Sequence, residues 1–253
     1  MRFHPSEISR SCVTLSARAR LLVIAGIVLS FWSGGASAAP LPASDPDWIT
    51  TVQQRIAEGE YQPRLEPAGY RLFNRSQGLR AWVDPDGLTV MPAGISSAPV
   101  GDDTWTLRIG LTAWGRDDAI EPVPAAVPQL GACLETGELD ERGDCVRRVE
   151  QDYGELTGWW ANRAGGLEQG WTLSVSPPGS GPVVLELALE GLAVAGDSDG
   201  RGVTLEGGLR YEGLQVWDAA GRSLPAELVA DGERLRIVVD DTDALWPVTI
   251  DPV

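Results

Sequence analysis

The sequence predicts a mainly β protein, an antiparallel β-sandwich with one short N-terminal amphipathic helix. Apolar and polar residues alternate with period two in most segments after residue 79, as expected for strands with one buried face. The 30 Gly and 18 Pro supply turns between these segments. No long stretch has the helical period that would cover a parallel sheet. Together these observations favour two packed antiparallel sheets.

Residues 1–38 are predicted to be a secretory signal peptide. Arg20 closes a positively charged segment, an apolar run follows over 21–32, and small residues at 36–38 precede Ala39. The apolar run is too short for a membrane span, which needs about 20 residues. We therefore expect export to the extracellular space, the cell surface or the periplasm. The mature chain should begin at Ala39 and should not insert into a membrane.

The charge and residue inventory excludes several classes of function. All 20 basic residues are Arg, and the only His is His4. The signal peptide takes away four Arg and one of the 36 acidic residues, which leaves 16 Arg against 35 acidic residues, a net charge of −19. Such a surface repels nucleic acid and anionic lipid. Without His or Lys, the mature chain cannot form a Ser-His-Asp triad, a His-ligated zinc site or a Schiff base.

The first element of the mature chain is expected to be the helix. Residues 39–45 form a Pro-rich lead, and Asp45 and Pro46 are typical of a helix start. Apolar residues then recur at spacings of three and four, which predicts an amphipathic helix over 46–58 that ends at Gly59.

The rest of the chain is expected to form strands in a single extended domain over 46–253. A hairpin is predicted with its turn at 84–87, and Trp105, Leu107, Ile109 and Leu111 should share one face of the next strand. Two short strands are expected, one on each side of a bulge near Gly213. The last strand should pair inside a sheet. The predicted strands are 79–83, 88–91, 105–113, 183–189, 209–211, 214–216, 235–239 and 248–250.

Two cysteines remain in the mature chain, Cys133 and Cys145, and export predicts that they form a disulfide. A thiol metal or redox site is the alternative. The disulfide-closed loop and the proline-rich loop over 122–128 mark a possible subdivision of the domain near 115–145.

The C-terminal half resembles a known protein region. Its best motifs are ELTGWWAN at 155–162, GLEQGWTL at 166–173, LRYEGLQVWD at 209–218 and WPVTIDP at 246–252. These are similar to the β-rich N-terminal region of large bacterial exported proteins that carry FG-GAP repeats, which are integrin-alpha-like β-propeller repeats. Trp246 and Val248 replace the Tyr and Leu of a Y-P-L-T-I-D-P ending, and the sequence contains no FG-GAP repeat. The resemblance implies an accessory exported module and carries no catalytic residue.

The candidate sites each have a structural alternative. Trp114, Trp159 and Trp160 are candidates for stacking on sugar rings, or they replace Phe in the core. Because Trp159 and Trp160 are adjacent in a strand, one should be buried and the other at least partly exposed. Asp197 and Asp199 resemble half a calcium loop, or they form a turn between strands. The acidic residues at 240, 241 and 243 have the same two interpretations.

These observations favour a non-enzymatic structural or interaction module of a secreted or cell-surface bacterial protein. Its partner would be a protein or a glycan. The first alternative is a carbohydrate-binding module that uses exposed Trp. The second is a glycoside hydrolase, whose carboxylate pair would have to come from different strands. No cofactor is expected, except that Ca²⁺ remains chemically possible.

Overall fold

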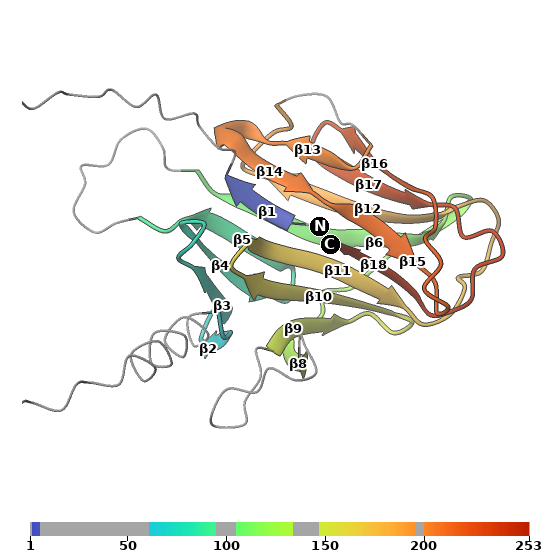
Figure 1. Cartoon of the computed structure of the whole chain (residues 1–253), viewed down its shortest axis with the longest axis horizontal. Coiled ribbons are helices and arrows are strands. Elements are labelled where there is room, and N and C mark those ends of the chain that lie inside the picture. The colour runs from blue at the N-terminus through green and yellow to red at the C-terminus, as the bar shows by residue number, and fades with distance from the viewer. Residues whose placement is uncertain (1, 6–60, 95–104, 134–146, 196–199, 253) are drawn as a thin grey trace, which may run out of the picture.

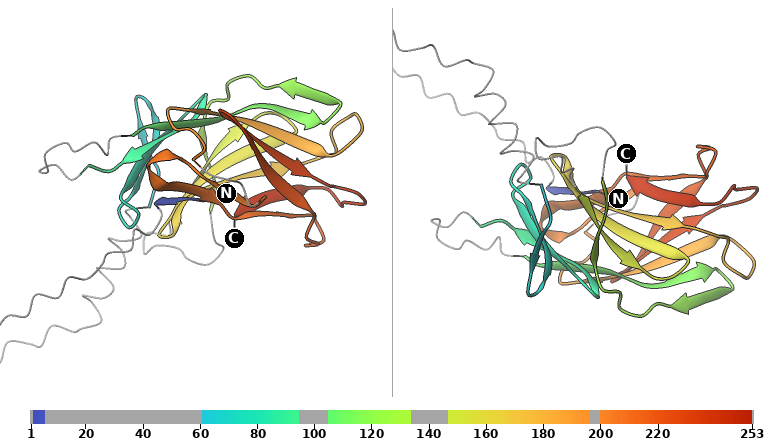
Figure 2. Two further views of the ribbon diagram at one scale, coloured as in Figure 1. Left: turned by 90° about the horizontal axis from the view of Figure 1, so that it is seen from above. Right: turned by 90° about the horizontal axis from the view of Figure 1, so that it is seen from below.

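The computed structural model describes residues 2–5, 61–94, 105–133, 147–195 and 200–252. Two antiparallel sheets of nine strands each pack against one shared apolar core (Figures 1 and 2). The predicted mainly β sandwich is therefore confirmed. The helix predicted over 46–58 lies outside the described residues.

One sheet, here called sheet A, combines the N-terminal strand with strands from the second half of the chain. Its main path runs β13-β14-β1-β11-β10-β9-β8, and β18 lies between β11 and β15. Its strands are β1 (Arg2–Pro5), β8 (Gln129–Cys133), β9 (Arg147–Asp152), β10 (Leu156–Arg163), β11 (Gly166–Leu173), β13 (Gly202–Thr204), β14 (Leu209–Glu212), β15 (Leu214–Trp217) and β18 (Val248–Pro252).

The second sheet, sheet B, runs β16-β17-β12-β6-β5-β4-β3-β2, with β7 paired to β6. Its centre is the pair β6·β12, so the parts of the chain before and after the 115–145 region share one sheet. Its strands are β2 (Arg64–Glu66), β3 (Gly69–Asn74), β4 (Leu79–Asp84), β5 (Gly87–Pro92), β6 (Leu107–Arg116), β7 (Ala119–Pro122), β12 (Val183–Glu190), β16 (Ala226–Asp231) and β17 (Arg234–Val239).

Most predicted strands agree with the observed ones. The hairpin β4–β5 turns at Pro85 and Asp86, and β14 and β15 are separated at Gly213, whose φ of 90° suits glycine. Val183, Leu185, Leu187 and Leu189 are buried as expected. The alternation therefore located both the strands and their buried faces.

The shared face predicted for β6 is correct as far as Leu111. Leu107 and Ile109 are fully buried, and Leu111, which lies opposite the buried Leu187, is half-buried against the core. The register with β12 shifts between Glu186 and Leu187, which leaves Thr112 as the extra residue of a bulge. The expectation for Leu111 is therefore confirmed, and the bulge changes the alternation only after it, where Trp114 lies opposite the buried Leu185 and packs against the core.

Buried amides link the two sheets at one end of the sandwich. Asn74 of sheet B donates to Oδ1 of Asn162 of sheet A at 3.0 Å, and Asn162 donates back to the Phe73 carbonyl at 2.9 Å. Because buried polar groups need partners, these bonds fix how the sheets align there.

Candidate functional site

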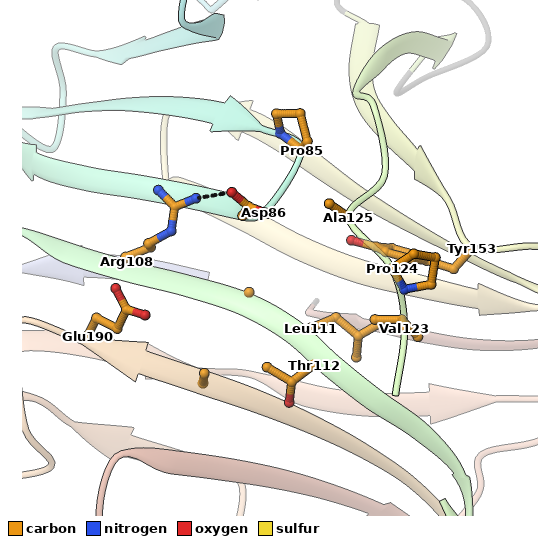
Figure 3. Close-up of a pocket in the computed structure, with 12 residues that line it drawn as sticks. Pro85, Asp86, Arg108, Leu111, Thr112, Val123, Pro124, Ala125, Tyr153 and Glu190 are labelled. Atoms are coloured by element: carbon orange, nitrogen blue, oxygen red, sulfur yellow. Dashed lines mark hydrogen bonds and ion pairs between the residues drawn. The ribbon is translucent and has the colours of Figure 1, made fainter. Parts of the chain in front are cut away.

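A cleft of about 390 Å³ lies on the outer side of sheet B, beside the β4–β5 turn (Figure 3). Its floor comes from β6 and β12, one wall from the β4–β5 turn, and the other wall from Tyr153 and the loop after β7. The lining residues are Pro85, Asp86, Arg108, Gly110, Leu111, Thr112, Val123, Pro124, Ala125, Tyr153, Ala188 and Glu190.

Arg108 is the one basic residue among the described residues that line the cleft. Its guanidinium donates to both carboxylate oxygens of Asp84, at 2.8 and 3.1 Å, and to the Thr89 hydroxyl at 3.1 Å. A longer contact of 3.3 Å joins it to Asp86. A guanidinium held in this forked geometry is fixed in position and keeps its charge.

Glu190 adds a second carboxylate on the other side of Arg108. The two residues are direct partners in the pairing of β6 with β12, and Glu190 is exposed. The cleft thus places Asp86 and Glu190 on two sides of one arginine (Figure 3). Asp86 lies in the β4–β5 turn and Glu190 in β12, so the cleft brings together carboxylates from separate elements.

Tyr153 forms much of the apolar wall. Burial, with the negative charge of Asp86 acting in the same direction, raises the pKa of its phenol to about 12. The phenol therefore stays protonated at neutral pH. It can offer an aromatic face and a hydroxyl, and it is a poor general base.

Gln151 holds the loop wall in place from behind. Its amide donates to the carbonyls of Asp84 and Ala126, each at 3.0 Å, and accepts from the Trp160 indole at 3.1 Å. The Ala126 amide in turn donates to the Pro85 carbonyl at 2.9 Å. The cleft walls are therefore tied to each other through a buried side chain of sheet A.

The adjacent tryptophans are not available for stacking. Trp159 is 4% exposed and Trp160 is 2% exposed, so the expectation that one would be exposed was wrong. They do point to opposite faces: Trp160 joins the core, while Trp159 lies across Gly170, with the Arg148 guanidinium 5.2 Å from its ring. Trp159 is therefore buried although it lies outside the shared core. Trp114 is half-buried against the core.

The other predicted site residues have different outcomes. Cys133 ends β8, but Cys145 lies outside the described residues, so the disulfide stays a prediction. Asp197 and Asp199 also lie outside them. Within the described ranges, no three His, Cys, Asp or Glu side chains are grouped to hold a metal ion.

The acidic run after β17 has structural roles. Asp240 accepts from the backbone and hydroxyl of Thr242, at 3.1 and 2.6 Å, and Asp241 pairs with Arg116 at 2.5 and 2.8 Å. These contacts support the interpretation of the run as a turn.

Sequence reasoning missed the cleft and its supporting residues. Gln151 offered one signal, because it is polar at a position that shares the buried face of Val149 in an alternating strand. Arg108 offered none, since its partners lie on the preceding hairpin and only pairing in the sheet brings them together.

Taken together, the fold and the cleft define a two-sheet β-sandwich with a polar cleft on one outer face. Comparison with protein-family models, curated proteins and solved structures found no match for the chain. Within the part of the chain that the structure describes, no helix is both long and apolar enough for a membrane crossing.

Proposed function

We propose that this chain is a non-enzymatic interaction module of an exported or cell-surface protein, and that the cleft beside the β4–β5 turn binds its ligand. The supporting observation is the Arg108 network, in which the one basic residue of the described cleft lining is already held by Asp84, Thr89 and Asp86. A preformed network of this kind suits recognition, because little reorganisation is needed on binding.

A glycan is the ligand class that the cleft favours. Tyr153 and Pro124 provide a flat apolar wall, while Arg108, Asp86, Thr112 and Glu190 provide donors and acceptors for hydroxyl groups. Carbohydrate binding would thus depend on Tyr153, in place of the buried tryptophan pair.

The test compares binding with turnover. The chain is screened against an array of neutral and acidic glycans, and the affinity of each hit is measured by calorimetry. Mass spectrometry of the ligand after long incubation then shows whether its mass has changed, which would indicate turnover. Tyr153→Ala should weaken binding at least tenfold. Tyr61→Ala, at a half-buried tyrosine outside the cleft, should leave it unchanged.

Two results would overturn this proposal. The first is equal affinity of the wild-type chain and Tyr153→Ala for every ligand. The second is conversion of a ligand that Asp86→Asn or Glu190→Gln abolishes while binding persists, since that would show a hydrolase with these two carboxylates.

A further inference from the structure

Four residues from the N-terminus complete the interior of sheet A. In β1, Phe3 lies opposite Leu167 of β11 on one side and opposite Tyr211 of β14 on the other. The Phe3 side chain is fully buried, and its ring centroid is 4.6 Å from that of Tyr211. This short strand therefore fills a gap both in the backbone hydrogen bonds of the sheet and in the core.

The gap is one part of a longer space, here called the lane, that is bounded by β11 on one side and by β14 and β15 on the other. β18 occupies the other part, pairing with β11 at Trp171 and with β15 at Leu214. Both β1 and β18 run antiparallel to β11, and the marked N- and C-terminal ends lie beside each other in Figure 1. β1 therefore continues the direction of β18, in a lane that is one strand wide.

The predicted cleavage before Ala39 would take β1 away. The exported chain would then keep β18 in the lane but lose the partner strand of β11 and β14, together with the side chain beside Tyr211. Strand edges without a partner accept extended polypeptides by backbone pairing, and a pocket for one side chain gives such binding its specificity.

We propose that the lane between β11 and β14 is an acceptor groove for an extended strand of a partner polypeptide. The strand runs antiparallel to both neighbours and inserts an aromatic side chain beside Tyr211. A basic residue precedes the aromatic one, because the register places Arg2 opposite Glu168 and Glu212. The inference rests on the proposed interaction role and specifies the partner class for a second surface.

The chemistry of the groove favours a polypeptide over other ligands. β1 is paired along both of its edges, so the occupant must offer donors and acceptors on both sides at strand spacing. Leu167, Leu209 and Tyr211 are fully buried around the Phe3 position, which requires a large apolar side chain there.

The test uses the full 253-residue chain with Phe3→Asp, which weakens the tethered β1, and a labelled peptide that copies residues 1–8. Fluorescence anisotropy should show at least tenfold tighter binding to Phe3→Asp than to the wild-type chain, whose groove is already filled. Phe73→Asp is the matched control, because the Phe73 side chain is 37% exposed on β3. The same peptide with alanine in place of its phenylalanine should bind at least tenfold more weakly.

Hydrogen exchange locates the binding. The peptide should slow exchange of backbone amides in β11 and β14 of Phe3→Asp. If Phe3→Asp does not fold alone, the peptide should restore its cooperative thermal unfolding, and the alanine peptide should not.

The proposal of an acceptor groove would be overturned if Phe3→Asp bound the peptide that copies residues 1–8 and its alanine variant with equal affinity. Unchanged hydrogen exchange in β11 and β14 would also overturn it. If Phe3→Asp is unfolded alone and the peptide does not restore its cooperative thermal unfolding, the proposal is likewise wrong. Tyr153→Ala should leave peptide binding unchanged, so failure at the cleft and failure at the groove are distinguishable.

Discussion

Gln151 shows how one buried amide can organise both the core and the cleft. It bonds to the backbone of the β4–β5 turn, to the loop at Ala126 and to the indole of Trp160. The side chain is 2% exposed, so water cannot replace these bonds. Loss of the amide would leave two carbonyls and an indole N–H without their partner.

Gln151→Met should therefore destabilise the protein strongly. Methionine keeps the shape but not the hydrogen bonds, and buried unsatisfied groups lower the free energy of unfolding by about 2–4 kcal/mol in total. Urea unfolding measures the loss. Gln129→Met, at an exposed glutamine, is the control and should change the free energy by less than about 0.5 kcal/mol. Similar stability of the two variants would contradict the role given to Gln151.

Asp251 makes stability depend on pH in an unusual direction. Burial, above all, raises the pKa of its carboxyl to about 6; the negative charge of Glu168 adds to the rise, while the chain's amino terminus, Arg163 and Arg148 oppose it. Because the pKa in the folded state exceeds the unfolded value of about 4, the folded state binds the proton more tightly. Ionisation of the buried Asp251 carboxyl therefore lowers the free energy of unfolding. This loss is absent below about pH 4 and complete above about pH 6.

Asp251→Asn should stabilise the protein at pH 7 by about 1 kcal/mol, a value already reduced for solvent screening of a partly exposed group. The gain over the wild type should disappear as the pH falls through 6 to 4. Thermal unfolding of both proteins across this range measures it. A gain that stays constant with pH would show that the carboxyl does not titrate as expected.

At the scale of elements, the last strand is an internal part of sheet A. β18 lies between β11 and β15, and Val248 and Ile250 are buried in the core. The expectation that the final strand pairs inside the sheet is confirmed. The C-terminal strand is therefore part of the folded body.

Deletion of residues 244–253 should abolish cooperative folding. Burial of Val248 and Ile250 contributes about 1.5–3 kcal/mol each, and the edges of β11 and β15 would lose their pairing as well. Circular dichroism during heating measures the transition. Leu245→Ala is the control, since this side chain is 58% exposed and its loss should have little effect. Retention of the full transition temperature after the deletion would place β18 outside the core.

The predicted disulfide belongs to the segment after β8. Cys133 ends that strand, and closure of the loop to Cys145 should stabilise the protein by about 3 kcal/mol in the chain-entropy account. Mass spectrometry of the exported protein should find a mass two hydrogens below the dithiol form. Reduction should then lower the transition temperature. Two free thiols in the exported protein would contradict the prediction.

Local pattern explains why the strands could be predicted and the cleft could not. Period-two alternation fixes which residues of β12 or β17 face the core, because that choice depends only on neighbours in the sequence. The bulge at Thr112 depends on the pairing of β6 with β12, which lies far along the chain. The cleft likewise assembles residues from Pro85 to Glu190, so no local spacing marks it.

At the scale of the whole molecule, a prediction from the sequence and an observation in the structure disagree about the N-terminus. The sequence of residues 1–38 predicts removal at export, whereas the structure places Phe3 in the core between β11 and β14. Both hold if the uncleaved chain and the exported chain are two different states. In the first state β1 fills the lane, and in the second state the lane is open to a partner strand.

Comparison of the two forms tests this account directly. The full chain made in the cytosol should unfold at a higher temperature than the exported chain, because the exported chain lacks a fully buried phenylalanine worth about 3–5 kcal/mol and the pairing of β1. The peptide that copies residues 1–8 should raise the transition of the exported chain and leave the full chain unchanged. The mass of the exported chain, measured first, should correspond to residues 39–253. A mass that still includes residues 2–5 would refute the signal peptide, and β1 would then be a permanent strand of the mature sandwich. Equal transition temperatures for two forms of the expected masses would instead show that β1 adds nothing to the fold.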